Sequence, residues 1–98
     1  MTPFNLERTK ALVREFSELM LSRMIDHQDK GDWSDKPLIS FFPRFLSLSA
    51  DLFQAFVKND FTAVGEKCVH LGNYCMMLAS RVGYIVPVNF DDPDAYSE

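Results

Sequence analysis

The sequence has no excess of basic residues, no long apolar run and few cysteines, and each absence excludes a class of protein. Ten Lys and Arg stand against 14 Asp and Glu, for a net charge of −4, so nucleic-acid binding through phosphate neutralisation is not expected. No run of about 18 apolar residues is present and no signal peptide opens the sequence, so we expect no membrane partner. Cys68 and Cys75 would lie about 10 Å apart on one helix, which is too far for a disulfide. We therefore expect a reduced, cytoplasmic setting.

The sequence is rich in apolar residues. Of its 98 residues 47% are hydrophobic, and they include nine Phe and five Met. A chain of this length forms one domain and buries only a modest fraction of its surface. Either the core is rich in aromatic side chains or part of the apolar surface packs against a partner.

The acidic excess is concentrated at the C-terminus. Apart from Asp91, Asp92, Asp94 and Glu98, acidic and basic residues are equal in number. These acids follow the last helical pattern, so the sequence predicts a helical domain over residues 1–88 and an extended acidic tail over residues 89–98. The tail either recognises a basic partner surface or keeps a Phe-rich protein soluble.

The first expected helix spans residues 3–28. Thr2 and Pro3 have the chemistry of an N-cap followed by a first-turn proline. The side chains expected on its inner face then recur every three or four residues. They are Leu6, Val13, Phe16, Leu19, Met20, Met24 and His27. Residues 29–37 contain Gly and Pro and predict a loop. Trp33 in this loop either packs its ring on the helices, which is the favoured alternative, or stacks on a ligand.

The second expected helix spans residues 37–58. A proline in a helix interior removes a hydrogen bond, so Pro43 indicates either a kink or a short helix over 37–41 before a main helix that starts near Pro43. One apolar stripe consists of Leu38, Phe41, Phe45, Leu48, Leu52 and Phe56, and a second of Ile39, Phe42, Leu46 and Phe53. A helix that is apolar on two sides is buried on two sides. The second stripe therefore predicts contact with a second copy of the chain.

The third expected helix spans residues 61–83. Asp60 or Thr62 can cap its start, and Gly83 stands where a C′ glycine belongs. Its core stripe is expected to be Val64, Cys68, Leu71, Cys75, Leu78 and Val82. The sequence thus predicts an all-α protomer of three helices and a symmetric homodimer that packs its second and third helices into a four-helix core.

Three segments carry a resemblance to a known family. They are His27-Gln28-Asp29-Lys30-Gly31-Asp32-Trp33, Asp51-Leu52-Phe53-Gln54-Ala55 and Asn73-Tyr74-Cys75-Met76-Met77-Leu78-Ala79. In this order and spacing, over residues 15–82, the chain resembles the MazG-like family of all-α nucleotide pyrophosphohydrolases, particularly the short versions found in bacteriophages.

The resemblance implies a metal site that has lost most of its ligands. The family holds Mg²⁺ with a Glu-x-x-Glu and a Glu-x-x-Asp and cleaves nucleoside triphosphates between the α and β phosphates. These ligands fall on Leu48, Asp51, Lys67 and His70, of which only Asp51 is a carboxylate. The ammonium of Lys67 adds a repulsion of about 4 kcal/mol per unit charge at about 4 Å for an effective dielectric constant near 20. We therefore predict no catalytic residue, no metal ligand and no cofactor, with Mg²⁺ as the alternative if hydrolysis persists.

The degenerate cleft is expected to contain Lys30, Trp33, Asp51, Glu66, Lys67, His70 and Asn73. On a helix, Glu66 points about 100° away from Lys67, and Asn73 matches the family's asparagine. His70 with Asp51 has the chemistry of a general-base couple, but the sequence supplies no nucleophile beside it. The two histidines and two cysteines lack the tight spacing of a zinc site.

Two classes of function follow from these features. The sequence favours a catalytically inactive MazG-like homodimer of phage type that acts by binding a host protein. The alternative is a protein that still binds a nucleotide or another phosphate ligand, with Lys67 where the metal cation stood and Lys30 nearby, or that retains residual Mg²⁺-dependent hydrolysis.

Overall fold

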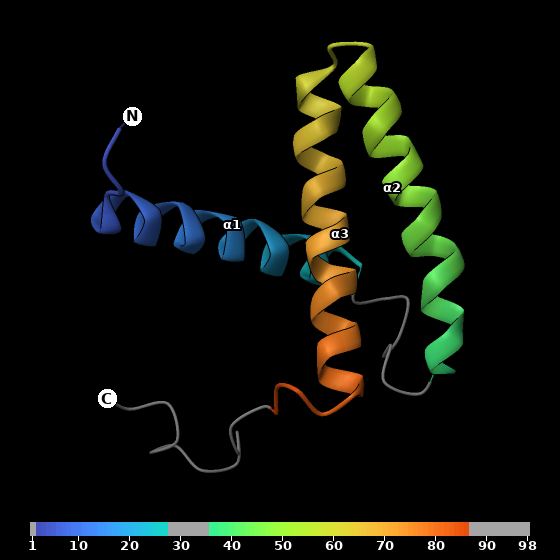
Figure 1. Ribbon diagram of the computed structural model, residues 1–98. Coiled ribbons are helices and arrows are strands. Elements are labelled where there is room, and N and C mark those ends of the chain that lie inside the picture. The colour runs from blue at the N-terminus through green and yellow to red at the C-terminus, as the bar shows by residue number, and fades with distance from the viewer. Residues whose placement is uncertain (1, 28–35, 87–98) are drawn as a thin grey trace.

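The computed structural model describes residues 2–27 and 36–86, and the regular structure in these two ranges is entirely helical (Figure 1). Helix α1 spans Leu6–Asp26, the 3₁₀ helix η3 spans Leu38–Ser40, α2 spans Phe41–Val57 and α3 spans Phe61–Arg81. The predicted all-α class with three main helices is confirmed. None of the helices described is both long and apolar enough to cross a membrane. The expected acidic tail, residues 89–98, lies outside the described residues.

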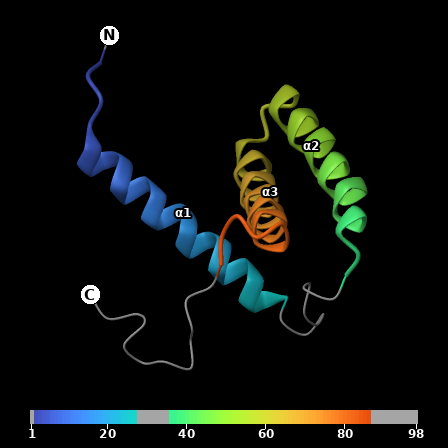
Figure 2. The same cartoon turned by 60° about the horizontal axis from the view of Figure 1, so that its bottom comes forward.

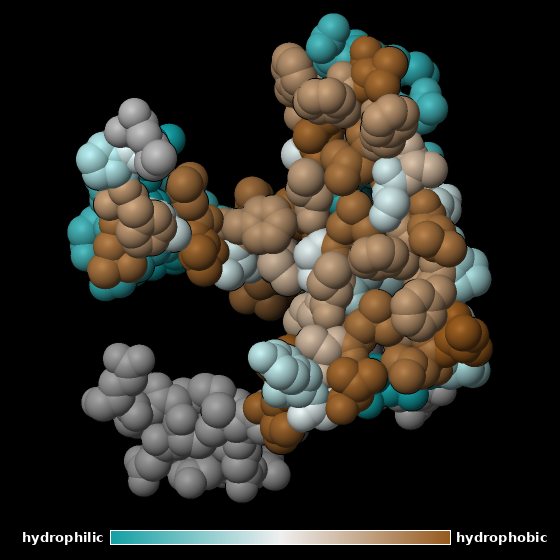
Figure 3. Space-filling model, in the orientation of Figure 1, coloured by the Kyte–Doolittle hydropathy of each residue, from teal (hydrophilic) through white to brown (hydrophobic). Residues whose placement is uncertain are grey.

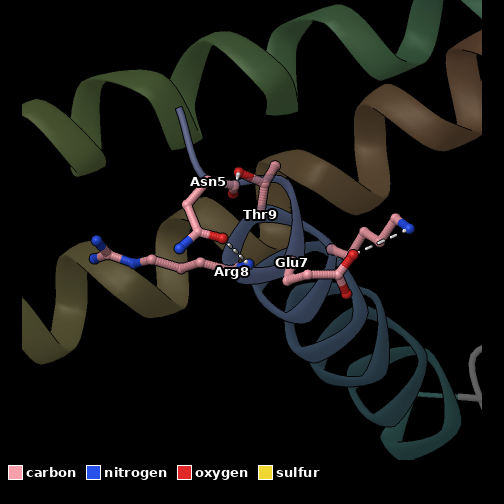
Figure 4. A network of polar contacts seen from close by, with 5 residues as sticks. Asn5, Glu7, Arg8 and Thr9 are labelled. Atoms are coloured by element: carbon pink, nitrogen blue, oxygen red, sulfur yellow. Dashed lines mark hydrogen bonds and ion pairs between the residues drawn. The ribbon is translucent and has the colours of Figure 1, made fainter. Parts of the chain in front are cut away.

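Helix α1 begins later than the sequence predicted. Its N-cap is Asn5, whose side-chain oxygen accepts a hydrogen bond from the Arg8 backbone N–H at 3.0 Å. Thr9 Oγ1 donates to the Asn5 carbonyl at 2.9 Å, and Figure 4 shows Asn5 turned over the first turn of the helix. The predicted start at Thr2 and Pro3 is wrong because Asn5 also carries a capping oxygen and lies directly before the helical run.

Pro43 lies in the first turn of α2, where a proline is tolerated. The 3₁₀ helix η3 ends at Ser40, which is also the N-cap residue of α2. The first four N–H groups of an α-helix have no partner within the helix, so a proline at this position removes no hydrogen bond. The second sequence alternative, a short helix followed by a main helix that starts near Pro43, is confirmed.

The turns after α2 and α3 use the same hydrogen-bonding pattern. After α2, the N–H groups of Asn59 and Asp60 donate to carbonyls of the last turn at 3.1 and 3.0 Å, with Asn59 at a φ of 58°. After α3, Gly83 begins the same pattern at a φ of 80°, as in a Schellman motif. Asp60 then caps α3 by accepting from the Ala63 N–H at 3.2 Å. The predicted roles of Asp60 and Gly83 are confirmed.

Helix α3 is the element against which both other long helices pack. Helices α2 and α3 lie side by side and antiparallel, and α1 crosses α3 (Figures 1 and 2). The Phe41 ring, at the start of α2, lies edge-to-face with the Tyr74 ring at a centroid distance of 6.2 Å. The Arg81 guanidinium lies 5.9 Å from the Phe41 centroid and donates to the Lys36 carbonyl at 2.5 Å. These contacts join the start of α2 and the residues before it to the second half of α3.

Helix α1 approaches α3 most closely at Gly72. A Cβ built on Gly72 would lie 3.0 Å from Cε1 of Phe16 and 3.4 Å from the sulfur of Met20. The next residue, Asn73, donates its Nδ2 to the Met20 carbonyl at 3.1 Å. The missing side chain at position 72 therefore permits the crossing, and the amide at position 73 fixes its register.

The core between α2 and α3 is small. Its buried apolar residues within the described chain are Phe41, Leu48, Ala55 and Met77, and Leu48 has 0% of its surface exposed. Burial of Phe41 and Leu48 confirms part of the first stripe predicted for the second helix. A core of this size is modest for a chain of 98 residues.

The core faces predicted for the first and third helices are wrong in part. Helix α1 has no buried residue. The exposed members of its predicted face are Leu6, Val13, Phe16 and Leu19. Cys75 of α3 and its C-cap residue Val82 are exposed, and the buried side chains of the helix are Asn73 and Met77. Asn73 and Met77 are four residues apart and share one face of α3, so the buried face is not centred on the predicted stripe.

The second apolar stripe of α2 is uncovered. Its members, Ile39, Phe42, Leu46 and Phe53, are all exposed, and apolar side chains cover much of the visible face of the α2–α3 hairpin in Figure 3. The N-terminal half of α1 projects away from the hairpin (Figures 1 and 2). The radius of gyration of 16.0 Å exceeds the value of about 13 Å expected for a compact domain of about 100 residues. The protomer is open.

The two glycines within α3 provide a matched test of the α1 crossing. Nothing lies within 4 Å of a Cβ built on Gly65, unlike Gly72. Gly65→Ala should stabilise the fold by about 0.5–1 kcal/mol through helix propensity alone. Gly72→Ala should be less stable than Gly65→Ala by about 1 kcal/mol, because Phe16 and Met20 must move. Urea unfolding of both variants measures the difference, and equal gains in stability would contradict the crossing described.

Candidate functional site

The four positions where the resemblance predicts metal ligands lie on the facing helices α2 and α3. Leu48 is fully buried between the helices, while Asp51, one turn further along α2, is exposed. Lys67 and His70 are half-buried on α3. Within the described residues, Asp51 forms no ion pair with Lys67. The ion pair found there joins Lys10 to Glu7. The position of Leu48 is thus part of the core and not a wall of an open cleft.

The central contact of the site joins His70 to Arg23, a residue that sequence reasoning missed. Arg23 lies in the last turn of α1, and its Nε donates to Nε2 of His70 at 2.7 Å, with Nη2 also directed at that nitrogen. A guanidinium can only donate. Nε2 of His70 must therefore accept, so the ring is neutral and carries its proton on Nδ1. No local signal predicts this contact, because the two residues are 47 positions apart.

His70 lies in a positive electrostatic environment. Burial lowers the pKa of His70 below its ordinary value of 6.5, and the nearby charges of Arg23, Lys67, Arg44 and His27 lower it further. The rings of His27 and His70 lie edge-to-face with centroids 6.5 Å apart. All three helices contribute to this group. We call Arg23, Arg44, Lys67 and His70 the basic corner.

Asn73 is the buried polar residue beside the basic corner. Only 4% of its surface is exposed, and its Nδ2 is bonded to the Met20 carbonyl. Its Oδ1 has no hydrogen-bond partner among the described residues. An unpaired buried acceptor costs about 1–3 kcal/mol. Asn73 therefore joins α3 to α1 through its Nδ2, while its unpaired Oδ1 lowers the free energy of unfolding.

Arg23 also belongs to the lining of a recess. The recess has a volume of about 160 Å³ and lies between α1 and α3. Its lining consists of Leu19, Ser22, Arg23, Asp26, Glu66 and Val69. Glu66 thus faces this recess with Asp26. No group of three or more His, Cys, Asp or Glu within the described ranges is arranged to hold a metal ion.

Five of the seven predicted site residues can be placed. Lys67, His70 and Asn73 lie together on α3, Asp51 lies on the surface of α2, and Glu66 lines the recess. The other two, Lys30 and Trp33, lie outside the described residues. No family model, curated protein or solved structure matches the chain.

The lowered pKa of His70 makes the stability of the fold depend on pH. Keeping His70 neutral contributes stability that is fully present above the unfolded value of 6.5 and is lost as the pH falls through the lower folded pKa. Arg23→Gln should raise the pKa of His70, because it removes the nearest cation. Lys58→Gln, an exposed change of the same charge at the end of α2, should leave it unchanged. NMR titration of the ring protons reports both, and an unchanged pKa in Arg23→Gln would contradict the contact.

Proposed function

We propose that the protein is a non-hydrolytic MazG-like helical protein that works as a homodimer and acts by binding another protein. The observation that carries the proposal is the basic corner, which occupies the region where the resemblance calls for carboxylates. The exposed apolar face of α2 supports the homodimer contact, and the exposed apolar face of α1 supports the contact with another protein.

The basic corner opposes the binding of a divalent cation. Arg23, Arg44 and Lys67 each repel Mg²⁺, by about 4 kcal/mol per unit of charge on the ion at about 4 Å and an effective dielectric constant near 20. Mg²⁺ prefers oxygen ligands in near-octahedral geometry. Asp51 is the carboxylate that remains among the four expected positions, and it is exposed. One solvated carboxylate does not offset repulsion from several cations.

The protein should therefore release no pyrophosphate from nucleoside triphosphates. With Mg²⁺ or Mn²⁺ and each common nucleoside triphosphate, production of pyrophosphate should remain at the level of the buffer control. Asp51→Asn serves as the matched variant and should behave as the unmodified protein does. Turnover that disappears in Asp51→Asn would show that a functional metal site exists around this residue.

A second copy of the chain is the occupant that best fits the outer face of α2. The face is a continuous stripe of large side chains, of which Leu46 and Phe53 are 66% and 62% exposed. Burying a side chain of this size stabilises an interface by about 1.5–3 kcal/mol. Because the protomer buries few apolar side chains of its own, burial in a dimer interface would add to its stability. A symmetric dimer brings two identical stripes together, because the same patch faces itself across a two-fold axis.

Charge placed in the stripe should dissociate this dimer. Phe53→Asp should change the sedimenting species at tens of micromolar from dimer to monomer, because two carboxylates would be desolvated in the interface. Ser47→Asp adds the same charge to an exposed position of α2 outside the stripe and should remain dimeric. A monomeric unmodified protein, or equal effects of the two variants, would contradict this interface.

The exposed face of α1 is the surface left for a protein partner. Leu6, Leu12 and Val13 are exposed on it, and no residue of the helix is buried. Apolar residues at this spacing suit a helix that lies in the groove of another protein.

Two variants of α1, compared for their capture of a host protein, test this surface. A host protein captured by the unmodified dimer should be lost with Leu12→Asp, which adds a charge to the apolar face. Capture should persist with Glu15→Gln, an exposed change on the same helix. Equal capture by both variants would place the partner elsewhere.

A further inference from the structure

The charged residues of α2 lie on a single narrow face. Arg44, Asp51 and the C-cap residue Lys58 follow one another at intervals of seven residues, which is about two turns of an α-helix. The other residues of the helix carry no charge. Its inner face, against α3, and its outer face, toward solvent, are both uncharged. No charged side chain of α2 therefore opposes burial of the outer face.

The outer face has the spacing of a coiled-coil seam. Phe42, Leu46, Ser49, Phe53 and Phe56 are separated by steps of four, three, four and three residues, which place them about 180° around the helix from the charged face. We call these five residues the outer seam. Its four apolar members are between 45% and 66% exposed, and α1 lies on the side of α3 away from α2 (Figures 1 and 2). The described part of the protomer leaves the outer seam uncovered.

Ser49, the polar member, is compatible with burial in this seam. Its Oγ donates to the Phe45 carbonyl of the preceding turn at 2.9 Å. A hydroxyl that is already hydrogen-bonded within its own helix loses no water-bonded donor when it is covered. Ser49 is also the smallest member of the outer seam, so it leaves room for a large side chain opposite.

We propose that the outer seams of two copies of the chain pack antiparallel, with the two-fold axis between Ser47 and Leu48. The inference rests on the homodimer proposed above and specifies how its two α2 helices meet. In this register Phe42 of one copy faces Phe53 of the other. Leu46 faces Ser49 of the other copy, so a large side chain fills the space beside a small one.

The pattern favours this register over a parallel one. The steps from Phe42 to Phe53 read the same in both directions, so each of these seam residues meets another seam residue when one helix is reversed. In a parallel dimer each position meets its own copy, and two Ser49 side chains would leave a gap in the middle of the interface. The antiparallel arrangement also brings Phe56 to Ile39 of the other copy, which lies in η3 and is 73% exposed.

Isotope-filtered NMR of the unmodified protein tests the register, because a mixture of labelled and unlabelled chains reveals contacts between copies alone. We expect contacts between the rings of Phe42 and Phe53, and between the methyl groups of Leu46 and the Cβ protons of Ser49. Sedimentation of the same sample reports the dimer independently. A dimer in which Phe42 contacts Phe42, or in which the outer seam makes no contact between copies, would overturn the antiparallel register while the homodimer stands. A monomer would overturn the homodimer and the register with it.

Disulfide cross-linking provides a second test. In a chain carrying Cys68→Ala and Cys75→Ser, the double substitution Phe42→Cys and Phe53→Cys should give a covalent dimer on oxidation. The two positions lie about 16 Å apart along one helix, which is too far for a bridge within a chain. Phe42→Cys alone should give no covalent dimer, and an equal yield from this single variant would indicate a parallel register and overturn the proposal.

The matched control is Arg44→Cys with Asp51→Cys in the same cysteine-free chain. These positions have the same register about the two-fold axis but lie on the charged face, and their replacement leaves the net charge unchanged. On oxidation, the control should contain no more covalent dimer than the cysteine-free protein does. Equal yields from the control and from the double substitution in the outer seam would show random collision and overturn the proposed interface.

Discussion

The crossing of α1 over α3 is the contact on which the site depends. Phe16 and Met20 rest where Gly72 has no side chain, and Asn73 fixes Met20 by a hydrogen bond. One turn further along α1, the same register brings Arg23 to the ring of His70. If α1 lay one residue out of register, Arg23 would be turned about 100° around its helix, and His70 would lose the partner that fixes its tautomer. The chemistry of the corner therefore follows from the packing of two helices.

This packing also explains why the resemblance to a hydrolase need not imply hydrolysis. In a metal site of this geometry, carboxylates from two helices would face a shared cation. Here Leu48 fills the space between α2 and α3, and Lys67 contributes a charge of the opposite sign. Arg23 then adds a second positive charge from α1. The positions where the resemblance predicts carboxylates therefore hold one carboxylate, one apolar side chain, one ammonium and one imidazole.

Local features could be predicted from the sequence where one residue type meets one backbone requirement. Asp60 caps α3, Gly83 follows its end with a positive φ, and Pro43 marks the first turn of α2. The start of α1 was mispredicted because Thr2 and Asn5 both carry capping oxygens, and local chemistry alone does not choose between them. Asn59 in the left-handed region was also missed, although Asn is among the residues that adopt it most readily.

Features that depend on contacts between helices could not be predicted in the same way. The pattern of α2 correctly indicated a second uncovered stripe, because periodicity shows which side chains share a face. The pattern of α1 did not show that this helix buries none of its residues, because burial depends on the angle at which α1 crosses α3. The positions of Lys67 and His70 on one helix face followed from their spacing. Arg23, in contrast, enters the site only through tertiary packing.

The most direct test of the charge reversal is paramagnetic broadening by Mn²⁺. Mn²⁺ broadens the NMR signals of nuclei close to it, so a substoichiometric titration locates a metal site residue by residue. The amide signals of Asp51, Lys67 and His70 should remain as sharp as those of Lys58 at the far end of α2. Selective loss of the three signals at low Mn²⁺, reversed by EDTA, would show that a divalent cation binds at the corner and would contradict its basic character.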